Sequence, residues 1–125
     1  MSEEIEIGQF WAVPASAAAP PLLVGVFSID EDGNGGTVVG VFVQPHPQAQ
    51  ESGWPTVDHM PLNAETLGLV HARLVRSGAS AGTRFEEGYG QWARAFADGK
   101  AGVFSIPVSE AYAMVAGVAE NKDVR

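Results

Sequence analysis

The sequence contains no cysteine, and it contains no lysine or arginine before Arg73. The absence of cysteine excludes disulfides, thiolate metal sites and a cysteine nucleophile. No apolar run approaches the roughly 18 residues that would span a bilayer. The first residues, MSEEIEIG, lack the charged-then-apolar pattern of a secretory signal. Together these absences predict a soluble, cytoplasmic protein that does not associate with membranes.

The acidic charge is concentrated in the N-terminal part of the chain. Residues 1–72 carry nine acidic side chains and no base, whereas the remainder carries seven bases and six acids. A protein with a net charge of −8 does not neutralise phosphates, so nucleic-acid binding is disfavoured. The one-signed field of residues 1–72 can attract a basic partner or a cation, or it can serve solubility alone.

The chain is long enough, and apolar enough, for one folded domain. It has 125 residues, of which 46% are hydrophobic. At this length about two thirds of the unfolded surface can be buried, which is sufficient for a core. We therefore expect a single domain over residues 1–125, with a charged tail that frays from about residue 120.

The stretch Leu22–Gln44 is the clearest structural signal. Two runs rich in Val and Phe flank the acidic, glycine-rich segment Asp30–Gly36, a pattern typical of a β-hairpin. Both faces of both runs are apolar, which predicts a pair of strands in the middle of a covered sheet.

Three further segments have strand character. Glu4–Val13 alternates between apolar and polar residues. The long Pro-rich segment Pro45–Pro61 is expected to be a loop that hides a short edge strand around Thr56–His59. Ala101–Ile106 is predicted to form a fourth full strand, which Pro107 ends.

Three helices are expected. The first begins with Asn63 as N-cap, carries Leu67, Val70 and Leu74 on its apolar face, and ends at Gly78. The last is capped by Ser109 and has an apolar face of Ala111, Met114, Val115 and Val118. The middle helix ends at Gly99. In it, Thr83 and Glu86 match a capping box. Its apolar face is an aromatic stripe of Phe85, Tyr89, Trp92 and Phe96.

The order of these elements is β-β-β-α-α-β-α. Consecutive strands followed by helices predict an α+β fold, with a mostly antiparallel sheet of about four strands and helices packed on one face. The aromatic stripe is interpreted as core packing against that sheet, because an apolar sheet face must be buried.

Two sets of residues are candidate metal sites. Asp30, Asp32, Asn34 and Gly35 match the first half of a calcium-loop pattern, but the twelfth position is Val41 and the flanks are strands. A polar hairpin loop accounts for the same residues. The histidines, His46, His59 and His71, have no compact metal-ligand spacing, and scattered surface histidines are favoured over a metal site or a His–Asp general base. No cofactor and no catalytic residue is predicted.

Two functional hypotheses remain. The first is a small acidic interaction protein, of inhibitor, immunity or adaptor type, that binds a basic protein partner through its N-terminal half. Its candidate contact residues are Asp30, Glu31, Asp32, Trp54, Asp58 and His59. For Trp54 itself, packing that anchors the long loop to the core is favoured over recognition, because Trp is mostly buried. The second hypothesis is a small-molecule-binding domain or small enzyme with a pocket between the sheet and the aromatic helix, rimmed by Asp58, His59 or His71.

Overall fold

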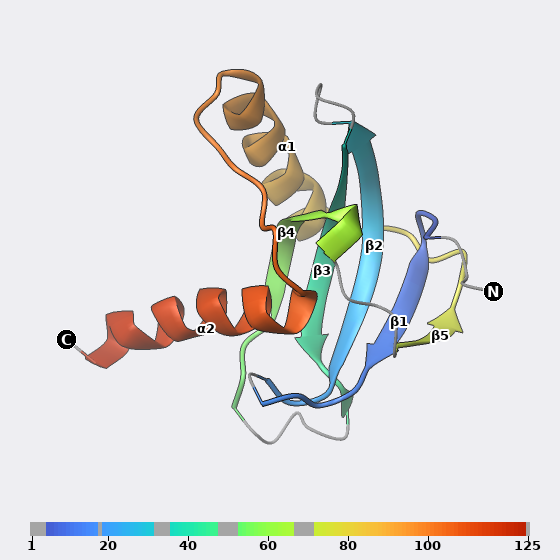
Figure 1. Cartoon of the computed structure of the whole chain (residues 1–125), viewed down its shortest axis with the longest axis vertical. Coiled ribbons are helices and arrows are strands. Elements are labelled where there is room, and N and C mark those ends of the chain that lie inside the picture. The colour runs from blue at the N-terminus through green and yellow to red at the C-terminus, as the bar shows by residue number, and fades with distance from the viewer. Residues whose placement is uncertain (1–4, 18, 32–35, 48–52, 67–71, 125) are drawn as a thin grey trace.

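The computed structural model describes residues 5–17, 19–31, 36–47, 53–66 and 72–124, with side chains as far as Ala116 (Figure 1). The elements are β1 (Gln9–Val13), β2 (Leu22–Glu31), β3 (Thr37–Pro45), β4 (Val57–Asn63), the short 3-10 helix η2 (Ala64–Thr66), β5 (Arg73–Arg76), α1 (Thr83–Ala97) and α2 (Val108–Val124). The predicted α+β class is confirmed.

All five strands pair antiparallel in one sheet, in the order β4-β3-β2-β1-β5. β2 and β3 are the predicted hairpin and lie near the centre of the sheet, where Val24 and Val41 are fully buried. β4 is the expected edge strand and extends further than Thr56–His59. It contains Pro61, which an edge strand tolerates because it needs ladder hydrogen bonds on one side only. The sheet thus has five strands where about four were expected.

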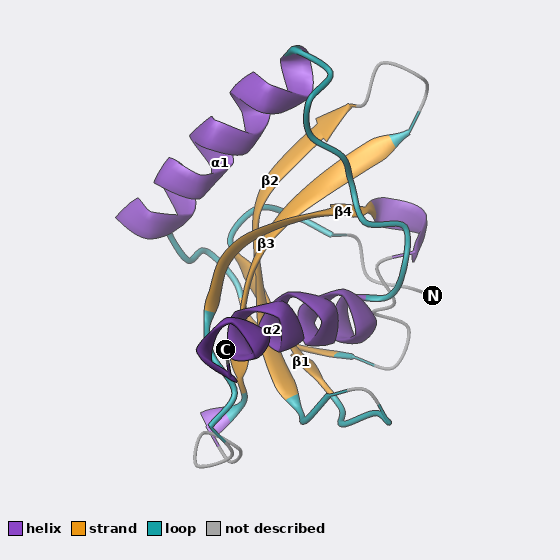
Figure 2. Cartoon of the chain, turned by 90° about the vertical axis from the view of Figure 1, so that its left-hand side faces the viewer, coloured by secondary structure: helices purple, strands orange, loops and turns teal. Residues whose placement is uncertain are grey.

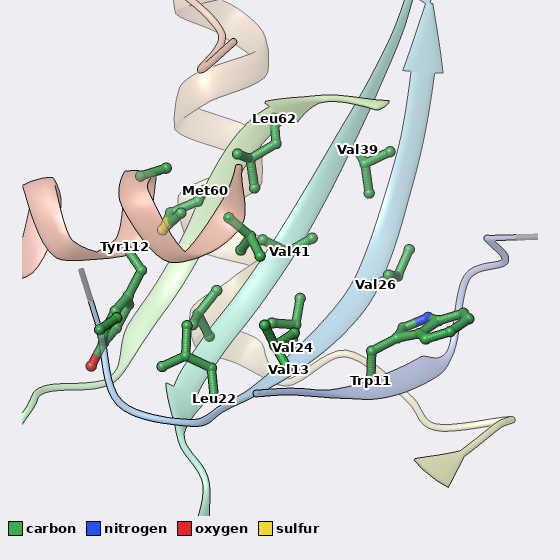
Figure 3. Packing of buried hydrophobic residues seen from close by; sticks show 14 of the residues in the cluster. Trp11, Val13, Leu22, Val24, Val26, Val39, Val41, Met60, Leu62 and Tyr112 are labelled. Atoms are coloured by element: carbon green, nitrogen blue, oxygen red, sulfur yellow. The ribbon is translucent and has the colours of Figure 1, made fainter. Parts of the chain in front are cut away.

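One face of the sheet, which we call the α2 face, carries the main hydrophobic core (Figure 3). Alternate residues of each strand point toward α2, as the period of two requires. Full burial of each such aliphatic side chain stabilises the fold by about 1.5–3 kcal/mol relative to exposure. The buried residues of this face include Trp11, Val13, Leu22, Val24, Val26, Val39, Val41, Met60 and Leu62 from the strands, with Val108, Ala111, Tyr112 and Ala116 from α2.

The opposite face, which we call the α1 face, is aromatic. Phe10 contacts Phe27 and Phe42 edge-on, and Phe27 contacts Phe85 of α1. Figure 2 shows the sheet lying between α1 and α2. The helices therefore cover opposite faces rather than the single face expected, because the central strands are apolar on both sides and each side needs cover.

The aromatic stripe of α1 is buried at one position only. Phe85 is 3% exposed, whereas Tyr89, Trp92 and Phe96 are all partly exposed. Trp92 stacks on Phe96, and its indole N–H donates a hydrogen bond to the Gly102 carbonyl. The expectation that the whole stripe is core is thus correct for the first turn of the helix, and the rest of the stripe packs on rings and on the following loop.

The predicted helix from Asn63 to Gly78 is wrong where the structure describes it. Asn63 ends β4, and its Oδ1 accepts a hydrogen bond from the Glu65 N–H in η2. Residues 67–71 lie outside the described residues. Arg73–Arg76 forms β5, which pairs with β1. The apolar spacing fitted a helix, but the free edge of β1 offers backbone hydrogen bonds that sequence periodicity does not reveal.

The predicted strand Ala101–Ile106 is also wrong. This segment makes one isolated parallel bridge, between Phe104 and Leu62. The Phe104 N–H donates to the Pro61 carbonyl, and the Phe104 carbonyl accepts from the Asn63 N–H. The segment therefore covers one end of the β4 edge without joining the sheet as a strand.

The helix ends differ from the predicted caps in two places. The N-cap of α1 is Gly82, with no side-chain cap, so the capping box of Thr83 and Glu86 is not formed. Ser109 lies inside α2, which begins at Val108. Gly99 follows the end of α1 with φ 73°, as its predicted role requires. Within the described residues, no helix has the length and apolar character needed to cross a membrane.

Candidate functional site

The predicted contact residues that the structure describes fall in three separate places: the end of β2, strand β4, and the segment before β4, which contains Trp54. Asp30 and Glu31 end β2, where the hairpin turns. Asp58 and His59 lie on β4, with Asp58 toward the end that is remote from Asn63. Asp32 lies outside the described residues, as do His71 and Asn34. The structure thus brings some of these residues together and separates others.

Asp30 and His59 are brought together beneath α1 by Tyr89. The Tyr89 hydroxyl lies 3.1 and 3.0 Å from the two carboxylate oxygens of Asp30, to which it donates a hydrogen bond. The Tyr89 ring also contacts the imidazole of His59, with the ring centroids 5.9 Å apart. Burial, the hydrogen bond to Asp30 and its charge all raise the pKa of Tyr89. The phenol therefore stays protonated and joins the hairpin end to α1.

His59 is enclosed by three aromatic residues of α1. Its ring centroid lies 5.2 Å from that of Phe85 and 5.8 Å from that of Trp92, in addition to the Tyr89 contact. Its Nε2 is buried and has no hydrogen-bond partner in the part of the chain that the structure describes. Burial lowers the pKa of His59 from 6.5 to about 4, and the negative charge of Asp30 opposes that shift. His59 is therefore neutral at pH 7 and is not a cationic contact residue.

Two glycines leave room for the side chain of His59. A Cβ on Gly40 of β3 would lie 2.1 Å from the Ser28 Oγ and 3.2 Å from the His59 Nε2. A Cβ on Gly88 of α1 would lie 3.0 Å from the His59 Cβ. A Cβ at position 40 would push His59 away from β3, and a Cβ at position 88 would push α1 away from β4. Ser28, which is 8% exposed, thus lies beside the imidazole on the same face.

Trp54 packs on the α2 face of the sheet. Its ring stacks on Tyr112 of α2, with the ring centroids 5.5 Å apart. The Tyr112 hydroxyl donates a hydrogen bond to the Pro55 carbonyl, and burial raises the pKa of Tyr112 to about 12. Trp54 therefore fastens the segment before β4 to the core. This packing favours the anchoring interpretation over a recognition role.

Sequence reasoning missed Glu65 as a member of the acidic group. Asp30 pairs with Val38, which in turn pairs with Asn63, and η2 with Glu65 follows Asn63 and contacts β3. Glu31 and Glu65 are exposed, whereas Asp30 is partly buried. We call this group of three residues (Asp30, Glu31 and Glu65) the acidic end. The sequence does not reveal this grouping, because Glu65 reaches the acidic end only through the register of β2, β3 and β4.

The charges are separated across the sheet. β1, β2, β3 and β4 contain no lysine or arginine, whereas the far edge strand β5 carries Arg73 and Arg76, both exposed. Since β5 lies beyond β1, no base of the sheet adjoins the acidic end. The negative field there is therefore not cancelled by a neighbouring strand.

No metal site is formed by the described side chains: in those ranges no three His, Asp or Glu residues are grouped so as to hold an ion. Much of the candidate calcium loop, residues 32–35, lies outside the description. A surface hollow of about 300 Å³ is lined by Gly102, Val103 and Phe104, beside the loop that Trp92 holds.

Comparisons of the chain with protein-family models, curated proteins and solved structures gave no match. The functional conclusion therefore rests on the geometry and charge of the described residues.

Proposed function

We propose that this protein is a non-catalytic interaction protein that binds a basic protein partner through its acidic end. The observation that carries this proposal is the charge separation across the sheet: strands β1 to β4 lack any base, and the bases of β5 lie on the far edge. Such a field accelerates encounter with a positively charged surface and orients it toward the acidic end.

The contacts of the acidic end support a division of roles. Glu31 and Glu65 are exposed, so they are the residues that meet the partner. Asp30 is engaged by Tyr89 and fixes the position of the strand end. Trp54 and Asp58 lie elsewhere and belong to the scaffold in this proposal.

Affinity capture from the source cell, followed by binding measurements with the purified captured protein, tests the proposal. We expect the double variant Glu31→Gln/Glu65→Gln to weaken binding about five- to tenfold at low salt and to reduce its salt dependence, because exposed charges act mainly on association. The control, Asp98→Asn/Glu110→Gln, removes two exposed acids from the C-terminal part and keeps the affinity. Equal losses in both variants, or salt-independent binding, would reject the proposal.

The second candidate function, a small-molecule site between the sheet and α1, has one observation in its favour: the buried, unpartnered Nε2 of His59 beside Ser28. The rings of Phe85 and Tyr89 already contact the imidazole, so a ligand there has to displace α1. A thermal-shift screen with metabolites and metals separates the candidates. A hit that Ser28→Ala abolishes supports the pocket, and its absence leaves the interaction protein.

A further inference from the structure

The contact between α1 and the sheet is narrow and is centred on one side chain of β4. Phe85 is the buried residue of α1, and its ring lies against Phe27 and His59. The next two rings of the helix, Tyr89 and Trp92, also meet His59. Gly88 lets the helix backbone approach the His59 Cβ closely. The imidazole thus touches three of the aromatic residues that hold α1 down.

The surroundings of this imidazole suit the neutral ring alone. From α1 it is faced by the aromatic rings and by one titratable group, the Tyr89 phenol. From β2 it is faced by the Ser28 hydroxyl and by the charge of Asp30, whose carboxylate already accepts from Tyr89. β3 presents Gly40. Asp58 adjoins His59 along β4 at the register shift of that strand, and burial and Asp30 account for the pKa shift of His59. Among the described residues, the buried Nε2 has no hydrogen-bond partner.

A proton on Nε2 would create a buried donor and a buried positive charge together. Burying either the donor or the charge costs free energy unless it has a hydrogen-bond partner. Water can supply that partner. Water reaches Nε2 when α1 lifts from β4. Such lifting breaks the hydrogen bond of Tyr89 to Asp30 and exposes Phe85, whereas the other rings of α1 are already partly exposed.

We propose that His59 is an acid-sensitive catch, which holds α1 on the sheet while neutral and releases the helix when it takes up a proton. The release uncovers the aromatic α1 face, including Phe27 and Phe85. This regulation requires no binding partner, so it stands or falls separately from the proposed function.

The pH range follows from the sign of the pKa shift. The pKa of His59 in the closed form is lowered to about 4, whereas the imidazole freed from the interface returns toward 6.5. The open form therefore binds the proton more tightly. The stability that the closed contact provides is fully present above pH 6.5 and is lost as the pH falls toward 4.

Amide hydrogen exchange of the full chain, followed by mass spectrometry at pH 7.5 and pH 5 and corrected for intrinsic rates, tests the catch. We expect protection of α1 to fall about tenfold or more relative to β2 and β3 at the lower pH. His59→Phe and His59→Leu replace the imidazole with an apolar side chain that does not titrate. In these variants we expect the protection of α1 to be the same at pH 7.5 and pH 5. The control His46→Gln retains the wild-type response.

Equal loss of protection in the sheet and in α1, or a pH response that persists in the His59 variants, would overturn the proposal. If neither variant folds, carbon-13 NMR of the wild-type imidazoles decides. A depressed His59 titration that coincides with shifts of α1 resonances supports the catch. A titration near the ordinary pKa with unchanged α1 resonances contradicts it.

Discussion

Gly40 determines how closely β2, β3 and β4 approach one another on the α1 face. The Ser28 Oγ of β2 and the His59 Nε2 of β4 reach toward the position that its Cβ would occupy. Ser28 pairs with Gly40 directly after the register shift that follows Val26. The bulge of β2 thus aims the hydroxyl at a place that only a residue without a side chain leaves open.

We expect Gly40→Ala to lower the free energy of unfolding by about 1–3 kcal/mol, because the new methyl group overlaps the Ser28 Oγ at 2.1 Å. Urea unfolding measures the loss. In the Ser28→Ala background the same substitution should cost less, since the overlapping oxygen is gone. Identical costs in the two backgrounds would show that Ser28 is not the obstacle.

Among the secondary-structure elements, α1 depends on the spacing of its two interior glycines. Gly88 faces β4, where an added Cβ would lie 3.0 Å from the His59 Cβ, whereas a Cβ on Gly90 meets nothing within 4 Å. Both glycines weaken the helix by similar amounts in propensity. They therefore form a matched pair in which packing is the only difference.

Gly90→Ala should raise the free energy of unfolding by about 0.5–1 kcal/mol through helix propensity alone. Gly88→Ala should be less stable than Gly90→Ala by about 1 kcal/mol or more, because its methyl group pushes α1 away from His59. Thermal unfolding of the two variants, measured side by side, checks the difference. Equal stability would mean that α1 can shift from β4 without loss.

The accuracy of prediction from sequence also differs between elements. The β2–β3 hairpin was predictable, because composition, turn residues and partner strands all lie within Leu22–Gln44. β5 was not, because its strand state depends on the edge of β1, more than 60 residues earlier. The aromatic helix was located correctly. Its contacts, however, depend on which face of the sheet α2 does not cover.

Only some members of the candidate site were predictable from the sequence. Asp30 and His59 were both named, but the residue that joins them, Tyr89, lies 59 positions from Asp30 along the chain. A tyrosine within an apolar stripe carries a hydroxyl that needs a partner, and that is the signal that could have found it. Trp54 was correctly favoured as packing, because large aromatic rings near a core are mostly buried.

For the molecule as a whole, charge opposes compaction. The net charge is −8, and the acids of residues 1–72 have no base among them. Folding brings Asp30, Glu31 and Glu65 to one end of the sheet and leaves the bases of β5 at the far edge. In the unfolded chain these acids are further apart on average. Repulsion therefore destabilises the folded form, and binding of a basic partner would relieve it.

We accordingly expect the melting temperature at pH 7 to rise by about 2–5 °C between 0.01 and 0.1 M NaCl, as the Debye length falls from about 30 to about 10 Å. Differential scanning fluorimetry measures the change. Glu31→Gln/Glu65→Gln should melt higher than wild type at low salt and respond less to salt. At pH 4.6, the isoelectric pH of the sequence, the salt response should vanish. A melting temperature that falls with salt at pH 7 would show that attraction across the sheet outweighs repulsion at the acidic end.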